Sequence, residues 1–224
     1  MRRFMVLPLA GLLALTMAGP AMAGPNVSNT SGSGETIYGE WSDGGTYGYV
    51  LIGEESGHGG FGEIYQESGE WVLCETAAGG PAGGKAGPST QDTGPGEEFY
   101  GFVGTRTSGW AFDLEVTLSR RLETGTASGS VELNTETIDE CNGSYGGDAV
   151  PEVGTINVSA TGVGSLVSFR GSGAYQIPSE FNGHENYRGS ERQAAGSVVA
   201  GSAIDASFDW GYLSKVTWTT HINE

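Results

Sequence analysis

The chain has 224 residues, of which 27 are Asp or Glu and 10 are Lys or Arg, so its net charge at neutral pH is −17. This acidic balance argues against nucleic acid and anionic membranes as partners, because both bind clustered Lys and Arg. Glycine is very frequent, with 40 residues, but it has no three-residue period, so the chain is not collagen-like. The glycines are expected to mark turns between short strands.

The first 23 residues have the layout of a secretory signal peptide. Arg2 and Arg3 precede an apolar run that ends in the small residues of Ala21-Met22-Ala23. The run is too short to span a bilayer. We therefore expect cleavage after Ala23 and a secreted protein, extracellular or periplasmic, without a membrane span. A flexible linker is expected over 24–35, followed by a single all-β domain over 36–224.

Alternating apolar and polar residues predict strands in the first half of the chain. The expected strands are Thr36–Trp41, Tyr47–Gly53, Phe61–Glu67 and Glu70–Thr76. The sequence Ser42-Asp43-Gly44-Gly45, between the first two, is typical of a hairpin turn. Ser68 and Gly69 are expected to form a second turn, between the last two.

Residues 77–97 are rich in Gly and Pro and have no apolar periodicity, so a disordered loop is expected there. The two cysteines, Cys74 and Cys141, lie on either side of this loop. In an exported chain an even pair most simply forms a disulfide, with two buried free thiols as the alternative. A bridge would join the two halves of the chain, which favours one domain.

The second half carries the strongest alternation. Even-numbered positions from Trp110 to Leu118 are apolar and the odd ones from 113 to 119 are polar, which predicts a half-buried strand. The last segment has the same parity, with apolar side chains at Phe208, Trp210, Tyr212, Val216, Trp218 and Ile222. Trp110, Trp210 and Trp218 are therefore expected in the core. Trp41 and Trp71 lie near turns and are the candidates for surface contacts.

About ten or eleven strands with short turns are expected, and no stretch has apolar residues at helical spacing. The sequence therefore predicts an all-β fold, either an antiparallel β-sandwich or a barrel, with the long Gly- and Pro-rich loop inserted in it.

The segment 138–148 is a candidate metal site. Asp139, Glu140, Asn142 and Asp148 offer hard oxygen ligands on a turning backbone, which suits Ca²⁺ as a cofactor. Their spacing matches no known calcium loop, so a solvated acidic loop without a metal is the alternative.

The segment 178–192 is a candidate ligand site, expected to be a loop between two strand regions. His184, Glu185, Tyr187 and Arg188 bring an imidazole, a carboxylate, an aromatic ring and a cation into one short stretch. Loops carry binding residues more often than sheets do, so these four residues are predicted to contact a ligand. A surface connection without a site is the alternative.

The sequence contains no G-x-S-x-G, H-E-x-x-H, C-x-x-C or Walker motif, so no catalytic residue is predicted. The leading hypothesis is an exported, non-catalytic β module that binds a ligand or a cell-surface partner. The alternatives are a secreted hydrolase with paired carboxylates and a structural envelope or matrix protein. A deep cleft with two carboxylates of raised pKa would favour the hydrolase. A shallow aromatic strip would favour sugar binding, and a sealed core without a pocket the structural role.

Overall fold

The computed structural model describes residues 27–75, 98–146, 150–177 and 181–223, so the predicted signal peptide and the predicted loop over 77–97 lie outside the described residues. The described part is one antiparallel sheet of eleven strands without a helix, which confirms the all-β prediction. The strands are β1 (Val27–Asp43), β2 (Thr46–Glu55), β3 (Gly59–Glu75), β4 (Glu98–Leu118), β5 (Thr124–Asp139), β6 (Ser144–Gly146), β7 (Glu152–Gly162), β8 (Val167–Ile177), β9 (Phe181–Ala200), β10 (Ile204–Phe208) and β11 (Trp210–Asn223).

The strands pair in a closed circuit. The path from β9 through β11, β1, β2, β3 and β4 to β5 is completed by β7, which pairs with both β5 and β9. Strands β7 and β8 lie one after the other along one edge of β9, and β10 and β11 lie along its other edge. Of the two architectures that the sequence predicts, the fold is therefore the barrel, and closure leaves its central part without unpaired edges.

One apolar core fills the barrel. Every second residue of the paired strands points inward, including the fully buried side chains of Ile37, Val50, Ile52, Ile64, Val131, Leu133, Ile156, Val198, Ile204, Phe208 and Leu213. The Phe208 ring lies against Gly39 and Gly196, where any Cβ would come within 2.7 Å of the ring. These two glycines therefore make room for the largest side chain of the core.

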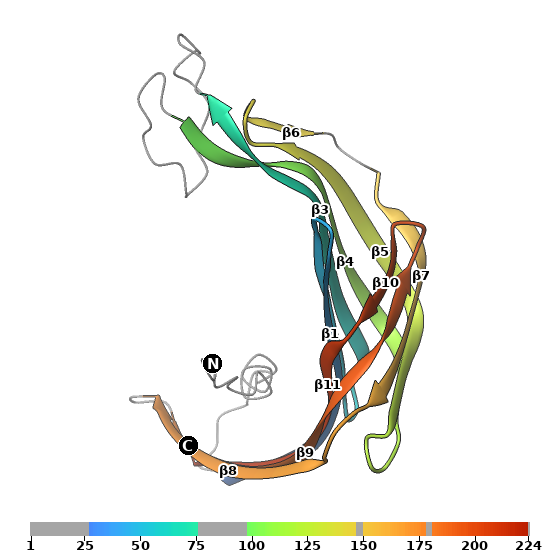
Figure 1. Cartoon of the computed structure of the whole chain (residues 1–224). Helices are drawn as coiled ribbons and strands as arrows, with labels where there is room; N and C mark the ends of the chain where they lie inside the picture. Colours follow the sequence, from blue (N-terminus) through green and yellow to red (C-terminus); the bar gives the residue numbers. More distant parts are fainter. Residues whose placement is uncertain (1–26, 76–97, 147–149, 178–180, 224) are drawn as a thin grey trace.

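The molecule is shaped like a letter C (Figure 1). At one end β3 and β4 run beyond β2 together with β5 and β6, and at the other end β8, β9, β11 and β1 run beyond the barrel. Both extensions bend toward the side of the barrel formed by β1 and β3, while β5, β7 and β10 form the opposite side. The outer surface of β1 to β4 is thus the concave side of the molecule.

The disulfide prediction is confirmed, because a bridge joins Cys74 and Cys141 with their Cα atoms 5.2 Å apart. Cys74 lies near the end of β3, and Cys141 lies in the turn between β5 and β6. Because β4 lies between β3 and β5 in the sheet, the bridge crosses β4 and joins β3 to the turn after β5. It therefore holds together the extension formed by β3, β4, β5 and β6, which is the upper extension in Figure 1.

Two predictions about strand boundaries are wrong. The turn at Ser68 and Gly69 does not form, because β3 continues through it while pairing with β4. Gly69 instead lies opposite Gly104, and the Phe102 ring covers both glycines. Residues 27–35, expected as part of a flexible linker, belong to β1 and pair with β11. The hairpin turn at 42–45 forms as expected between β1 and β2.

The predicted burial of the tryptophans is also largely wrong, because two irregularities reverse the parity of the strands. A bulge at Asp113, with a φ of 57°, turns Phe112 outward although Leu114 stays in the core. The break at Asp209 turns Trp210 outward and places Leu213 inside. Trp110 and Trp210 are therefore 57% and 45% exposed, whereas Trp41, expected at the surface, is 6% exposed. Trp218 is half-buried over Gly32 and Gly34, and Trp71 is exposed as expected.

Candidate functional site

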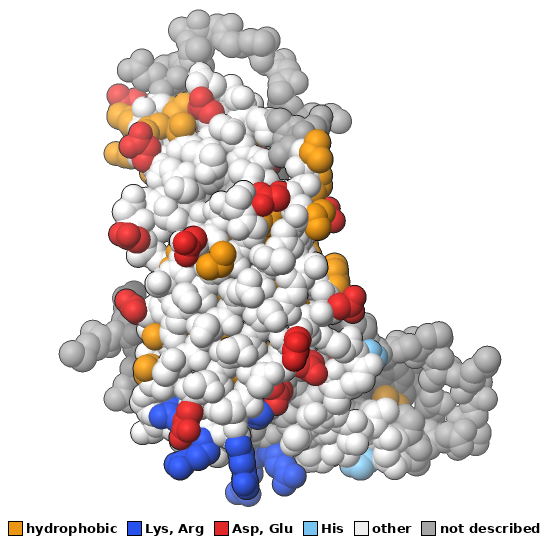
Figure 2. Space-filling view, turned by 90° about the vertical axis from the view of Figure 1, so that its right-hand side faces the viewer, with side chains coloured by type: hydrophobic (Ala, Val, Ile, Leu, Met, Phe, Trp, Pro, Cys, Tyr) orange, Lys and Arg blue, Asp and Glu red, His pale blue; other side chains and the backbone are white. Residues whose placement is uncertain are grey.

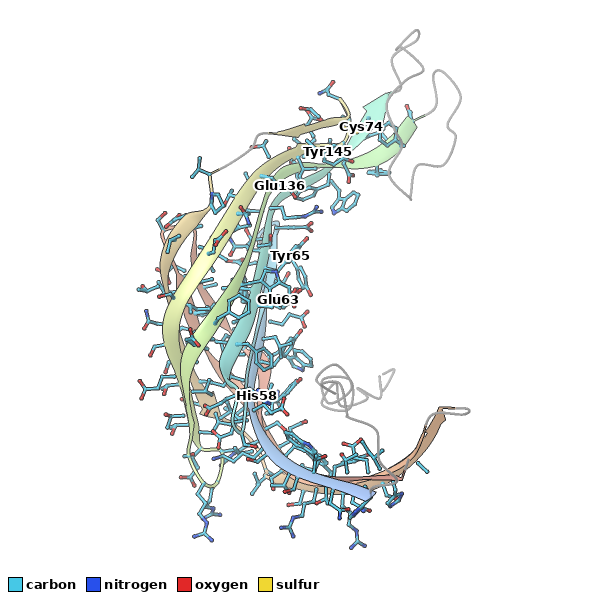
Figure 3. The ribbon with its side chains drawn as sticks, turned by 180° about the vertical axis from the view of Figure 1, so that it is seen from behind. His58, Glu63, Tyr65, Cys74, Glu136 and Tyr145 are labelled. Carbon is cyan, nitrogen blue, oxygen red and sulfur yellow. A yellow bond between two sulfur atoms is a disulfide. The ribbon has the colours of Figure 1, made fainter. Side chains whose placement is uncertain are left out.

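The concave face is the outward-facing surface of β11, β1, β2, β3 and β4, and aromatic and acidic side chains dominate it. Its residues are Tyr38, Glu40, Tyr47, Tyr49, Leu51, Phe61, Glu63, Tyr65, Glu67, Arg106, Trp110, Phe112, Trp210 and Tyr212. Figure 3 shows Glu63 and Tyr65 pointing into the space enclosed by the C. Directly opposed residues of adjacent strands share a face of the sheet, so the others point the same way.

The face is arranged in rows that cross the strands. One row runs through Trp210, Glu40, Tyr49 and Tyr65, and the next through Tyr212, Tyr38, Leu51, Glu63 and Trp110. Carboxylates thus lie directly beside aromatic rings in both rows. This mixture is unlike a polar solvent-facing surface and unlike an apolar interface core.

Several rings of this face are open to solvent. Phe112 is 67% exposed, and Tyr47 is 41% exposed. Trp71, on the upper extension, is 66% exposed and contacts Phe102 with 5.8 Å between ring centroids. Exposed aromatic rings that gather on one side of a molecule are typical of a binding surface.

The tyrosines are held in place by stacking and by hydrogen bonds. Tyr38 stacks on Tyr212 and Tyr49 on Tyr65, with centroid distances of 5.2 and 5.5 Å. The Tyr38 hydroxyl donates to Glu40 over 3.1 Å, and the Tyr49 hydroxyl donates to Glu63 over 2.6 Å. The rings are therefore fixed before any ligand arrives, which lowers the entropy cost of binding.

Among the described residues of the concave face, Arg106 is the one cation, and it joins β3, β4 and β5. Its guanidinium contacts Glu67 at 2.7 Å and Glu136 at 3.3 Å, and its Nε donates to the Tyr65 hydroxyl over 3.1 Å. Burial by itself lowers the pKa of Arg106, but the hydrogen bonds to Glu67 and Tyr65 outweigh it and raise the pKa above its usual value. Arg106 therefore keeps its charge and orients the carboxylates around it.

The environment keeps the tyrosine hydroxyls protonated. Burial and the charge of Glu40 raise the pKa of Tyr38, and burial and the hydrogen bond to Glu63 raise the pKa of Tyr49. Burial also raises the pKa values of Tyr47, Tyr65 and Tyr212. At neutral pH the face thus presents neutral phenols beside carboxylates, so it combines hydrogen-bond donors and acceptors with flat apolar rings.

The four residues of the predicted ligand site lie in strand β9, so the expected loop over 181–192 is wrong. Neighbouring residues of a strand point to opposite faces, which separates His184 and Arg188 from Glu185 and Tyr187. Tyr187 covers Gly171 of β8, and Arg188 lines a hollow on the opposite face of the sheet. The four side chains therefore do not converge, and a ligand role for each stays a prediction.

The predicted calcium ligands that the structure describes are occupied by contacts with the protein. Both carboxylate oxygens of Asp139 accept hydrogen bonds from Asn142, and Glu140 accepts one from the Phe102 N–H over 2.8 Å. Asp148 lies outside the described residues. No group of three or more His, Cys, Asp or Glu in the described segments is arranged to hold a metal ion. Calcium binding stays a prediction.

Comparisons of the chain with protein-family models, with curated proteins and with solved structures found no match. Within the described residues, no helix has the length and apolar character needed to cross a membrane.

Sequence reasoning missed most of the concave face. Glu63, Tyr65 and Glu67 alternate with the buried Ile64, which is a regular signal of a strand with one wet face. The informative detail is that this wet face carries an aromatic ring between two carboxylates. On the adjacent strand, Tyr47 and Tyr49 lie on either side of the buried Gly48. Only the register of β2 and β3 shows that they meet Glu67 and Tyr65.

Proposed function

We propose that this protein is a secreted carbohydrate-binding module whose concave face holds a neutral polysaccharide. The observation that carries the proposal is the rows of exposed rings and carboxylates on one rigid sheet. A sugar ring has apolar C–H faces and hydroxyl edges, so it needs a flat aromatic surface and hydrogen-bonding groups side by side. The concave face supplies both.

The charge of the face supports a neutral glycan over an acidic one. Glu40, Glu63 and Glu67 lie among the rings, and Arg106 is engaged by Glu67 and Glu136. An anionic polymer on this face would meet like charges. Carboxylates instead accept hydrogen bonds from sugar hydroxyls, and the tyrosine hydroxyls add further polar contacts. The disulfide is consistent with an oxidising extracellular location, where such polymers occur.

The proposal is tested by retention of the protein on cellulose, chitin and β-1,3-glucan. We expect retention on at least one neutral polymer, and we expect Trp110→Ala to weaken it about tenfold or more, because an exposed tryptophan on a binding surface is a typical hot spot. Val199→Ala is the control, since Val199 is exposed on the opposite side of the barrel. Retention of Trp110→Ala equal to that of wild type would contradict the proposal, as would failure to bind any polymer.

The same experiment separates binding from hydrolysis. Soluble sugars are measured after long incubation with the retained polymer. We expect none above the control without protein. Release of sugars that is lost in Glu63→Gln would identify a hydrolase that uses this face.

A further inference from the structure

Positive charge is concentrated at one end of this acidic protein. Of the Lys and Arg residues in the described segments, all except Arg106 belong to this cationic end: Arg120, Arg121, Arg170, Arg188, Arg192 and Lys215. Figure 2, which shows the convex side, has its Lys and Arg side chains gathered at the lower end of the molecule. Arg192 donates a hydrogen bond to the Arg121 carbonyl. Lys215 donates to the carbonyl of Leu118, two residues before Arg120.

Part of this cluster lines an open hollow. Arg170, Arg188 and Thr217 lie opposite one another on β8, β9 and β11, and Ser168, Ser190 and Lys215 form the adjacent row. These six residues line a hollow of about 620 Å³. Arg170 and Arg188 are direct cross-strand neighbours, and like charges in such positions repel. An anion between the two guanidinium groups would remove this repulsion.

Several of these cations have no acidic partner among the described residues. Lys215 pairs with Glu35 at 2.5 Å, and Arg121 lies 3.9 Å from Glu123. The ion pairs between described residues include none that involves Arg120, Arg170 or Arg188. The Arg188 Nε donates one hydrogen bond, to the Thr217 hydroxyl over 3.3 Å. The other N–H groups of Arg188 are available to a ligand.

Exposed aliphatic side chains lie beside the hollow. The connection between β7 and β8 carries Val163 and Leu166, which are 38% and 42% exposed. Leu166 lies two residues before Ser168 of the hollow, and the N–H of Val163 donates to the Gln193 carbonyl, next to Arg192. Aliphatic residues next to unpaired arginines are suited to the boundary between lipid headgroups and acyl chains.

We propose that the cationic end docks this protein on an anionic lipid bilayer, with the arginines on headgroup phosphates and Val163 and Leu166 in the interface. The acidic composition of the whole chain does not prevent this, because charges farther from the surface than the Debye length of about 10 Å at 0.1 M salt are largely screened. The adjacent aliphatic residues favour a bilayer over an anionic polysaccharide. This inference is independent of glycan binding, since it uses a different part of the molecule.

The test is co-sedimentation with vesicles of phosphatidylcholine alone or with 30% phosphatidylglycerol, at low and high salt. We expect binding only to the anionic vesicles, weakened by salt. R170Q/R188Q should weaken binding roughly 30-fold, because each basic residue near an anionic surface contributes about fivefold. The control T155D/S207D shifts the net charge equally on exposed positions of the barrel wall and should change binding less than twofold.

Three results would overturn the proposal. The first is no binding to anionic vesicles. The second is equal weakening by R170Q/R188Q and by the control pair. The third is that a sulfated polysaccharide binds the protein, displaces it from vesicles, and binds Leu166→Ser as well as wild type. That result would identify an anionic glycan as the partner. Retention on neutral polysaccharides by R170Q/R188Q shows whether the concave face is intact, so failure of one proposal is distinguished from failure of the other.

Discussion

The concave face and the convex wall are two outer surfaces of one barrel, and they differ in composition. The convex wall comprises the outward residues of β5, β7, β9 and β10. They include Thr124, Thr126, Ser128, Ser130, Thr155, Asn157, Ser159, Thr161, Ser197, Val199, Asp205 and Ser207, together with Glu132 and the exposed Val153. Most of these side chains are small and hydroxyl-bearing, and Figure 2 shows this side mostly white, with scattered hydrophobic and acidic groups. Large rings appear instead on the concave face.

Both surfaces cover the same core and belong to the same antiparallel sheet. Strand propensity alone does not explain the difference, because Thr and the aromatic residues are both common on strands. The contrast supports the proposal that the rings and carboxylates of the concave face bind an external partner. The comparison also shows that exposure, more than residue type, separates the structural aromatic residues from the candidate binding residues.

The largest expected effect comes from Phe208, whose ring lies in the core between the concave face and the convex wall. Phe208→Ala should lower the free energy of unfolding by about 3–5 kcal/mol, because it empties a large, fully buried site. Phe112→Ala, on the concave face, should lower it by less than about 1 kcal/mol. Urea unfolding of both variants gives these values. Similar losses in the two would show that the concave face is part of the structural core.

The second prediction concerns the response to alkaline pH, which should depend on the concave face. The native-state pKa values of Tyr38 and Tyr49 lie above their ordinary value of about 10. The unfolded chain therefore loses these protons first, so their contribution to stability is complete below about pH 10 and is lost as the pH rises through the native pKa values.

We accordingly expect the free energy of unfolding to fall above about pH 10, and to fall less steeply in Tyr38→Phe/Tyr49→Phe, which cannot ionise at these positions. Unfolding curves between pH 8 and 12 measure both slopes. An identical pH dependence in wild type and the double variant would mean that these hydroxyls do not sense the folded environment.

The smallest effect is expected on the convex wall. Ser197→Ala should change the free energy of unfolding by less than about 0.5 kcal/mol and leave retention on polysaccharides unchanged, because its side chain is exposed and distant from the concave rings. Thermal unfolding and the retention assay provide the two measurements. Loss of retention in this variant would move the binding surface to the convex wall and reverse the comparison.

Local sequence signals predicted the elements that depend on neighbouring residues. The turn at 42–45 and the alternation of β2 are read from a few adjacent positions, because turn geometry and side-chain direction are local properties of the backbone. The bridge between Cys74 and Cys141 followed from composition and the predicted export, since two cysteines have only one possible pairing within the chain. The all-β class followed in the same way from the repeated alternation.

The candidate site could not be found from these signals. Trp110 and Trp210 have the parity of core residues, but the bulge at Asp113 and the break at Asp209 turn them outward, and a one-residue shift in a strand exchanges its two faces. Nor does the sequence give the register that brings Tyr49 of β2 beside Tyr65 of β3.

The sequence by itself therefore determined the all-β class, the first hairpin and the disulfide of this protein. Only the tertiary structure decided that the sheet closes into a barrel, that its aromatic rings gather on the concave face, and that six of its scattered cations meet at one end. The physical reason is that strand closure and cross-strand register depend on contacts between residues far apart in the chain, whereas alternation and turns depend on neighbours.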